Sequence, residues 1–346
     1  MLVAETNAAV KRMYNSLLDN NIASDHNIDF IVSENHFTAH KNLYEAKPQL
    51  KDLLTFKKVV LCTINRAIKL VPTGLMRSRD SKDRLAWRHT LVVDESSLCT
   101  ELSIFELLPY LLYFKHIVFT GDPAQRSPFC YGKYQPKSIL EVLEERVRMN
   151  DKYIQHTFLN WQYRMPVDVG NMISDNFYDG KVKNARAPNE KKKLYFYDIS
   201  SSVHISDNGS RVAPEEANQA VFMANAFAKR VKNFEIVILA MYADQAAFLN
   251  TICKEAKVSK NIRCHTVDSF QGGEADIIIL CLSAYRKNLP NFITERKRLC
   301  VSLSRCRIRL VVIGDQTLLK DDSSWSKILK SFTVVNPKTR NRILKP

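Results

Sequence analysis

The sequence predicts an α/β protein with largely parallel sheets. Short apolar runs rich in Val and Ile recur along the chain, and most lack the polar alternation of a strand with one solvated face. Strands that are buried on both faces have this composition. Amphipathic stretches, such as residues 8–18 and 216–229, lie between the runs. This alternation is typical of β-α-β units, in which helices cover a parallel sheet.

The length and a break in the pattern predict two domains and a tail. A chain of 346 residues accommodates two domains of about 150 residues each. The pattern is interrupted near residues 160–166 and restarts at Lys193, after a charged loop. We therefore expect a first domain over residues 1–160, a second over 161–322 and a basic C-terminal tail over 323–346. The start of the tail, SSWSKILKSF, has a helical pattern. From Lys327 to Lys345 the tail is basic, and we expect it to be solvated, with contact to nucleic acid as the alternative.

Each expected strand is an apolar run bounded by polar or turn-forming residues. The runs before the break are residues 2–4, 58–64, 91–93 and 117–120. The runs after it are residues 194–197, 236–239, 264–267, 277–282 and 310–313. Because the strand–helix series restarts after the break, we expect one sheet in each domain.

Composition argues against a membrane or secreted protein and leaves a polyanionic partner open. The net charge is +15, from 51 basic and 36 acidic side chains. Such a surface is either simply soluble or attracts a polyanion such as RNA or DNA, and charge alone does not separate these. No run approaches the roughly 18 apolar residues of a membrane span. The N-terminus lacks the pattern of a signal peptide, so we expect no membrane partner and a cytoplasmic or nuclear location.

The eight cysteines predict neither a disulfide framework nor a zinc site. None forms a C-x-x-C pair, and several lie in apolar runs such as VVLCTI and IIILCLS. They are typical of reduced, small core residues in a cytosolic or nuclear protein. His36 and His40 lie four residues apart, but HFTAH lacks the metalloprotease glutamate, so we expect surface histidines there.

Two strands of the first domain end near carboxylates. The run HTLVVDES stops at Asp94 and Glu95, and the run KHIVFTGDPAQ continues into Asp122 and Gln125. Ligands of parallel sheets bind outside the carboxyl ends of the strands. Asp94 can order Mg²⁺ through its waters and Glu95 can polarise an attacking water, whereas Gln125 can sense a γ-phosphate or hold that water. A solvated loop after the acidic pair and a plain Gly-Asp-Pro turn stay open as simpler interpretations.

Three later segments carry groups that suit a nucleotide. Tyr163 and Arg164, in WQYRMP, offer a ring that can stack on a base and a guanidinium that can reach a phosphate. A core tyrosine beside a surface arginine is the alternative. Gly272, in HTVDSFQGGEAD, allows close approach of the backbone to a ligand. Arg305, in RKRLCVSLSRCR, would place a cation where phosphoryl-transfer charge develops.

In this order, the segments resemble those of superfamily 1 helicases of the regulator-of-nonsense-transcripts and senataxin type. VVDES resembles motif II, GDPAQ motif III, QYRM the family hallmark between the motor domains, MYADQAAFL motif IV, TVDSFQGGEAD motif V and RLCVSLSRCR motif VI. MLVAETNAAV resembles motif Ia and VVLCTI motif Ic. The likeness covers nearly the whole chain. It implies two RecA-like motor domains that bind ATP between them and translocate on single-stranded nucleic acid, with RNA favoured over DNA.

The resemblance also implies roles in ATP hydrolysis for individual residues. Asp94 would hold Mg²⁺, Glu95 would be the general base, and Gln125 would contact the γ-phosphate. Arg164 and Arg305 would be the γ-phosphate arginines. Motif VI departs from the family pattern only in small residues that neighbour the second of these arginines.

Further roles follow for the base, the ribose and the nucleic acid. Tyr163 would stack on the adenine, and Glu274 would contact nucleotide or ribose. The residues expected near the nucleic-acid backbone are Thr6, Asn7, Thr63 and Thr266. A helix N-cap is an alternative role for Thr6 or Asn7.

One segment of the family pattern is not found. The phosphate-cradling loop G-x-x-x-x-G-K-[ST] does not occur in the 346 residues. We therefore expect little ATP hydrolysis by these residues alone. We also expect an unpaired apolar edge at residues 117–120, where the strand of that loop would lie. Three interpretations stay open: the C-terminal part of a longer helicase, a degenerate helicase that serves as an RNA-binding or scaffolding module, and a chain whose missing strand comes from a partner.

Overall fold

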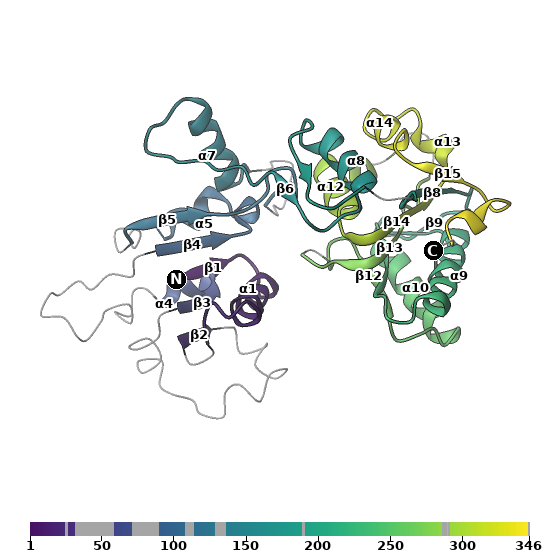
Figure 1. Ribbon diagram of the computed structural model, residues 1–346, viewed down its shortest axis with the longest axis horizontal. Helices are drawn as coiled ribbons and strands as arrows, with labels where there is room; N and C mark the ends of the chain where they lie inside the picture. The colour runs from purple at the N-terminus through teal and green to yellow at the C-terminus, as the bar shows by residue number, and fades with distance from the viewer. Residues whose placement is uncertain are drawn as a thin grey trace, which may run out of the picture. The chain divides into compact units, whose positions relative to one another are not determined.

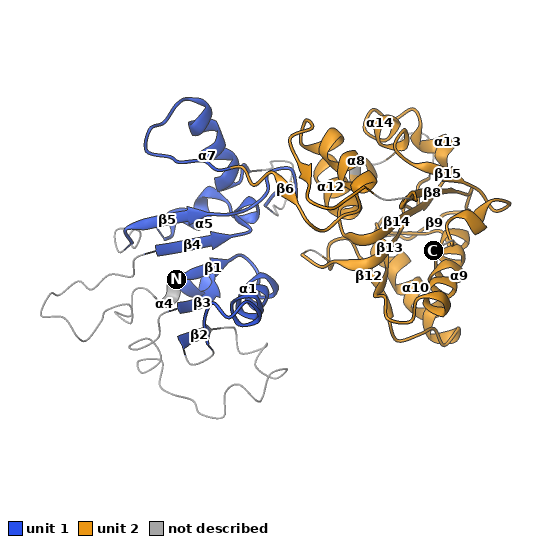
Figure 2. Cartoon of the chain, in the orientation of Figure 1, with its two compact units in different colours: residues 1–157 blue, residues 158–346 orange. Residues whose placement is uncertain are grey.

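A computed structural model describes residues 1–24, 27–31, 59–70, 90–107, 114–128, 136–188, 191–270, 272–285, 289 and 291–344. The segment HFTAH lies outside these residues. The chain divides into two compact units, Met1–Thr157 and Phe158–Pro346 (Figure 2). Each unit has its own sheet (Figure 1), and the predicted α/β class with parallel strands is confirmed. No helix in the described part of the chain is long and apolar enough to cross a membrane.

The first unit contains a five-stranded parallel sheet of order β2-β3-β1-β4-β5. Four of its strands fall on the expected runs: β1 (Leu2–Ala4), β3 (Val59–Thr63), β4 (Thr90–Asp94) and β5 (His116–Phe119). The strand β2 (Ile28–Ile31) was not predicted, because its sequence IDFI is short and contains a carboxylate. It pairs with β3 at one edge.

Helices cover both faces of this sheet. On one face, α1 (Asn7–Asp19) packs Ala9, Val10 and Tyr14 against residues such as Leu61. On the other, α4 (Ile64–Leu70) and α5 (Glu101–Phe105) pack against strand residues such as Val3. Neighbouring residues of one strand, such as Val3 and Ala4 of β1, therefore pack on opposite faces of the sheet, as the pleat requires. The 3₁₀ turn η4 (Ser96–Leu98) follows β4, and α7 (Ile139–Arg148) begins at a capping box formed by Ser138 and Glu141.

The strand β5 forms an apolar edge, as expected. Among the described strands it pairs with β4 alone. Ile117 and Val118, which point to opposite faces, are 37% and 42% exposed. A free edge of this kind is a template for pairing with another chain.

We expect Val118→Lys to reduce self-association, because a charge on an edge strand opposes edge-to-edge pairing. Sedimentation velocity measures the fraction of oligomer. The matched control is Ile205→Lys, which places the same charge on an exposed apolar residue of the paired hairpin strand β9 (His204–Ile205). An equal effect of the two substitutions, or none of Val118→Lys, would contradict the assignment.

The second unit contains a six-stranded parallel sheet of order β12-β11-β13-β14-β8-β15. Five strands fall on the expected runs, and their bounds are β8 (Leu194–Asp198), β11 (Ile236–Ala240), β12 (Ile262–Thr266), β13 (Ala275–Cys281) and β14 (Cys306–Gly314). All five residues of β11 and six of the seven of β13 are buried. The absence of polar alternation in these runs is therefore explained by burial of both faces of these strands.

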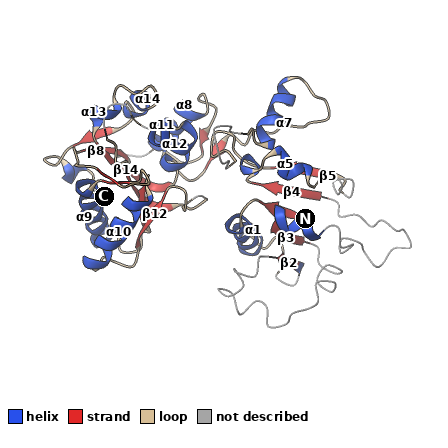
Figure 3. Cartoon of the chain, turned by 180° about the vertical axis from the view of Figure 1, so that it is seen from behind, coloured by secondary structure: helices blue, strands red, loops and turns tan. Residues whose placement is uncertain are grey.

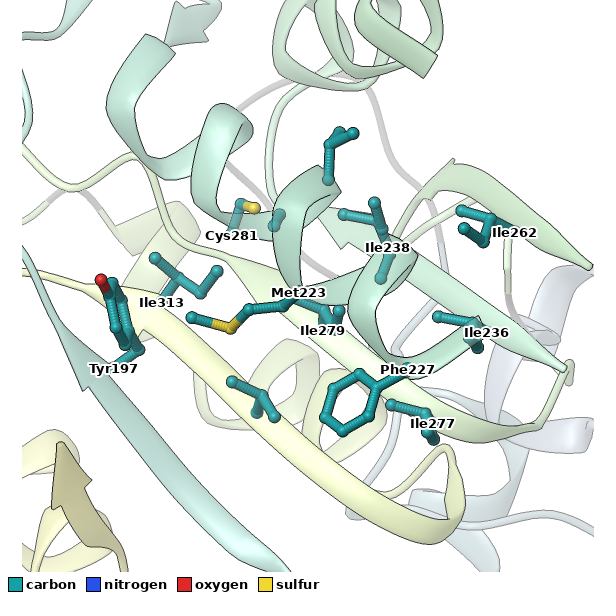
Figure 4. Packing of buried hydrophobic residues seen from close by; sticks show 14 of the residues in the cluster. Tyr197, Met223, Phe227, Ile236, Ile238, Ile262, Ile277, Ile279, Cys281 and Ile313 are labelled. Atoms are coloured by element: carbon teal, nitrogen blue, oxygen red, sulfur yellow. The ribbon is translucent and has the colours of Figure 1, made fainter. Parts of the chain in front are cut away.

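Two groups of helices accompany this sheet (Figure 3). The helices α9 (Pro214–Arg230) and α10 (Ala243–Glu255) lie against one face and bury Met223 and Phe227 against isoleucines of the strands (Figure 4). The helices α8 (Val167–Phe177) and α12 (Arg296–Leu303) pack on each other, together with α14 (Trp325–Leu329). Short elements complete the unit: β6 (Trp161–Gln162), β7 (Lys183–Asn184), β10 (Arg211–Val212), α11 (Asn291–Thr294), α13 (Gln316–Leu319) and η5 (Arg340–Arg342).

The expectation of a solvated tail over residues 323–346 is wrong. The helical start is confirmed as α14, but Trp325 is fully buried and its indole Nε1 donates to the carbonyl of Ile293 at 3.1 Å. The strand β15 (Thr333–Val335) then pairs with β8 and extends the sheet. Six lysines and arginines are spread over this segment, and they concealed the apolar residues between them that attach it to the core.

Glu216 is a buried carboxyl group whose ionisation opposes folding. It is 1% exposed, and Oε2 accepts a hydrogen bond from the backbone N–H of Ser283 at 2.9 Å. Burial raises the pKa of Glu216 from 4.5 to about 8, and the backbone hydrogen bonds only partly oppose this. The unfolded chain therefore binds fewer protons than the folded chain between these two values. Stability falls as pH rises through this window.

Glu216→Gln is expected to remove this pH dependence. The free energy of unfolding of the variant should exceed that of the wild type by a margin that grows between about pH 5 and about pH 8. Urea titrations at both pH values measure this margin. A margin independent of pH would contradict the assignment.

Candidate nucleotide and nucleic-acid sites

The carboxyl edge of the first sheet gathers the predicted residues of the first unit. Ala4 pairs in register with Thr63 on one side and with Asp94 on the other. Val93 pairs with Phe119 of the next strand. The segments that follow β1, β3, β4 and β5 therefore leave the sheet at the same end, where ligands of parallel sheets bind.

Asp94 is held at this edge through one of its two carboxylate oxygens. Its Oδ1 accepts a hydrogen bond from Thr120 Oγ1 at 2.5 Å, whereas Oδ2 has no hydrogen-bond partner among the described residues. No group of three or more potential ligand residues for a metal ion occurs in the described part of the chain. Mg²⁺ in nucleotide sites characteristically takes only one or two carboxylates and completes its shell with water and phosphate oxygens. Asp94 fits that limited role.

Glu95 lies beside Asp94 in a left-handed backbone conformation, with φ of 51°. Its Oε1 accepts a hydrogen bond from Arg12 Nη2 of α1 at 3.0 Å. This ion pair, which the sequence did not predict, links the carboxylate to the helix that follows β1. A non-glycine residue in this region costs conformational energy and is frequent at functional sites.

The turn after β5 packs tightly on the turn after β4. The backbone N–H of Ser96 donates to the carbonyl of Thr120 at 2.8 Å. A Cβ at Gly121 would lie 3.0 Å from that same nitrogen, so the tight packing favours glycine at this position. Gln125 Nε2 donates to Asp122 Oδ2 at 2.7 Å, as in an ordered turn. The turn interpretation is therefore confirmed, and contact of Gln125 with a γ-phosphate stays a prediction.

Thr6 and Asn7 start α1 at the same edge. Thr6 is the N-cap, and its Oγ1 accepts from the backbone N–H of Ala9 at 3.2 Å, so the capping role is confirmed. The buried Oδ1 of Asn7 has no hydrogen-bond partner in the described structure. Thr63, at the end of β3, is partly exposed. Their contact with a nucleic-acid backbone stays a prediction.

An ion-pair network joins two of the predicted residues of the second unit, Arg164 and Glu274. Arg164 Nε lies 2.5 Å from Glu274 Oε2, and Arg307 Nη1 lies 3.2 Å from Glu274 Oε1. Arg307 also pairs with Asp276 at 2.9 Å and with Glu235 at 3.1 Å. Burial alone would raise the pKa of Glu274, but the hydrogen bonds and charges of Arg164 and Arg307 outweigh it and hold that pKa below its ordinary value.

Strand pairing creates this network. Ala275 pairs in register with Cys306, so the residues that flank them, Glu274 and Asp276 on one strand and Arg307 on the other, are neighbours. The sequence prediction included Arg164 and Glu274 but missed Arg307. The two acidic residues around Ala275 and the two arginines around Cys306 were the available signal.

Tyr163 and Arg305 differ in accessibility. Tyr163 is 74% exposed, so the alternative of a core tyrosine is wrong. Arg305 is only 4% exposed, and its Nε donates to the carbonyl of Val301 at 2.9 Å. The predicted contact of Arg305 with a phosphate stays a prediction, and it requires the guanidinium to become accessible.

Thr266 lies at the opposite end of the second sheet from the ion-pair network. It pairs in register with Ala240, which pairs with Cys281 at the carboxyl end of β13, whereas Glu274 precedes the first residue of β13. Seven residues of strand separate the two levels by roughly 23 Å. The Oγ1 of Thr266 forms a hydrogen bond with Ser269 Oγ at 3.0 Å. The second unit therefore presents two separate polar sites.

The glycine pair between these sites is explained locally. Gly272 has φ of 69°, a conformation that favours glycine. A Cβ at Gly273 would lie 2.8 Å from the ring of Phe270. Both glycines let the loop return from the end of β12 to the start of β13, and the predicted approach of a ligand to Gly272 stays a prediction.

Comparison with known proteins assigns the chain to a family. The AAA domain family model matches residues 137–317. An alignment of 261 residues with Helicase sen1 of Schizosaccharomyces pombe is 28% identical, and it covers 69% of this chain and 15% of that protein. An alignment of 265 residues with a regulator of nonsense transcripts 1 homolog of Arabidopsis thaliana is 28% identical, and it covers 70% of this chain and 21% of that protein. This chain therefore spans about a fifth or less of the length of these two relatives.

This chain is also similar to a third curated relative and to a solved structure. An alignment of 256 residues with the 5'-3' DNA helicase ZGRF1 of Mus musculus is 26% identical, and it covers 69% of this chain and 13% of that protein. The crystal structure of Arterivirus nonstructural protein 10 (helicase) aligns with a TM-score of 0.48 and 14% identity, over 94% of this chain and 54% of that one. On the family match and the curated relatives, the chain belongs to the AAA domain family and, within it, to the superfamily 1 helicases of the regulator-of-nonsense-transcripts and senataxin type.

Proposed function

We propose that this chain is part of an ATP-driven motor that moves along single-stranded nucleic acid, with RNA preferred to DNA. Its residues would bind Mg²⁺-ATP and the backbone of the nucleic acid. The observation that carries the proposal is the common edge of the first sheet. There the register places Thr63 and Asp94 on either side of Ala4, and Glu95 and the turn that ends at Gln125 directly follow. One edge thus joins carboxylates suited to Mg²⁺-ATP with hydroxyl groups suited to a phosphate backbone.

The second unit has an exposed ring and a cation of the kinds that suit a nucleotide. The exposed Tyr163 offers a face on which adenine can stack, and Arg164 beside it has a guanidinium suited to phosphate. In this structure the guanidinium of Arg164 forms an ion pair with the carboxylate of Glu274. A nucleotide would replace part of that ion pair with its own anionic groups, while Glu274 would turn to the ribose. Bound Mg²⁺ would supply charge compensation for the phosphates.

Nucleic acid is expected to bind mainly through its backbone. Thr6, Thr63 and Thr266 are hydroxyl residues at the carboxyl ends of strands, and hydroxyl groups contact phosphate and sugar without reading sequence. The net charge of +15 favours such binding. Affinity for RNA should therefore fall steeply with salt and vary little with sequence.

ATP hydrolysis stimulated by RNA tests the proposal. The preparations are the 346-residue chain and the longest natural form of the protein that contains it. We expect single-stranded RNA to bind to both and to stimulate hydrolysis in a form that supplies a phosphate-binding loop. If the rate of hydrolysis were the same with and without RNA in both preparations, the proposal would be contradicted.

A nucleic-acid-binding module without ATPase activity is the second candidate. It is favoured by the present state of Gln125, whose amide donates to Asp122 and not to an open site. RNA binding without any hydrolysis, in a form that contains the phosphate-binding loop, would establish this alternative.

A further inference from the structure

Two cysteines of the second unit differ from the others that the structure describes. Cys62, Cys99, Cys281, Cys300 and Cys306 are buried, whereas Cys253 and Cys264 are partly exposed. The two sulfur atoms of this pair lie 3.5 Å apart, within hydrogen-bond distance. The expectation that the cysteines are reduced, small core residues fits the burial of the other five, but these two lie at the edge of the core.

The fold fixes the pair at a helix–strand contact. Cys253 lies in the last turn of α10, and Cys264 lies in the middle of β12. Both side chains pack with one side against the apolar cluster between α10 and the sheet. Among the described strands, β12 is at the sheet edge and pairs only with β11. The thiols are thus held together by tertiary packing and can be reached from solvent.

We propose that Cys253 and Cys264 form a dithiol site that hydrogen peroxide converts to a disulfide linking α10 to β12. The Cys253 thiolate attacks one peroxide oxygen, and the O–O bond breaks to give a sulfenic acid and hydroxide, which takes up a proton as water. The Cys264 sulfur then attacks the Cys253 sulfur and displaces its hydroxyl group as water. Two thiols and one peroxide become one disulfide and two waters.

We assign the donor in the hydrogen bond between the two thiols to Cys264, and this assignment sets the order of the two steps. A hydrogen bond from the Cys264 thiol lowers the pKa of Cys253, and burial only partly opposes this. The same hydrogen bond, together with burial, raises the pKa of Cys264. Cys253 therefore supplies the thiolate that reacts with peroxide. This inference does not depend on the proposed motor function.

Peptide mapping of the intact chain tests the site. The folded 346-residue chain is treated with hydrogen peroxide, free thiols are blocked, and the chain is digested with trypsin without reduction. Lys254, Lys257, Lys260 and Arg263 separate the two cysteines, so only a disulfide keeps their peptides together. We expect this linked peptide to form several-fold faster in the folded chain than in urea and to disappear on reduction. Its absence, or equal rates in both states, would overturn the proposal.

Two variants test the assigned roles. In Cys264→Ser, Cys253 should stop at the sulfenic acid and be captured by dimedone; in Cys253→Ser, Cys264 should give no adduct. The reverse pattern would overturn the assignment of Cys253 as the attacking thiol. Cys300→Ser, at a buried position, is the matched control and should leave the linked peptide unchanged. Circular dichroism checks each fold, and the corresponding alanine variants replace any serine variant that is unfolded.

Discussion

Glu95→Gln, in a form that contains a phosphate-binding loop, is expected to lower RNA-stimulated ATP hydrolysis by at least about 100-fold, because a positioned general base contributes roughly 10²–10⁴ in rate. The glutamine is nearly isosteric, and its carbonyl oxygen can still accept the hydrogen bond that Arg12 donates to Glu95. The substitution therefore removes the base and leaves the local contacts largely in place. Phosphate release in the presence of single-stranded RNA measures the effect.

The control for this variant is Glu101→Gln, which removes one exposed carboxylate from α5 in the same unit. It should leave hydrolysis unchanged. RNA affinity should be equal in the wild type and in Glu95→Gln, since the glutamate is not expected to contact the strand. Hydrolysis by Glu95→Gln within a few-fold of the wild type would exclude Glu95 as the base.

Trp325→Ala is expected to lower the free energy of unfolding by about 3–5 kcal/mol, the usual cost of replacing a large buried aromatic residue by alanine. Trp325 is fully buried, and its removal also leaves the carbonyl of Ile293 without the indole donor. Urea unfolding followed by far-ultraviolet circular dichroism measures the loss without relying on tryptophan fluorescence.

Lys330→Ala is the matched control, because Lys330 is the exposed C-cap of the same short helix. Exposed substitutions of this kind usually change stability by less than about 0.5 kcal/mol. If residues 323–346 were a solvated tail, the two variants would be equally stable. A larger loss of stability in Trp325→Ala than in Lys330→Ala would show instead that this segment is part of the fold of the second unit.

Most strands were predictable because strands that are buried on both faces consist of uninterrupted apolar residues. Every apolar run chosen from the sequence forms a strand, from Leu2–Ala4 to Cys306–Gly314. The edge strands Ile28–Ile31 and Thr333–Val335 were missed. They are short, and their polar neighbours conceal them. Their existence depends on pairing with β3 and β8, which is a property of the sheet and not of the local sequence.

The candidate sites were predictable in their residues and only partly in their contacts. The sequence located Asp94 and Glu95 at a strand end, but not Arg12, which is 83 residues away from Glu95 and reaches it through packing of α1. Arg307 was missed for a similar reason, because its partners come from two other strands. The burial of Arg305 could not be foreseen either, since no local pattern shows which of several nearby arginines turns inward.

The most direct test of the central claim is the coupling between nucleotide and RNA. The affinity for a labelled single-stranded RNA is measured by fluorescence anisotropy with and without a non-hydrolysable ATP analogue and Mg²⁺, in a form that contains a phosphate-binding loop. A motor requires the two ligands to bias each other's binding, and coupling of about 1–3 kcal/mol would change the affinity roughly 5- to 150-fold. RNA affinity that is identical with and without nucleotide would contradict the account and leave a nucleic-acid-binding module.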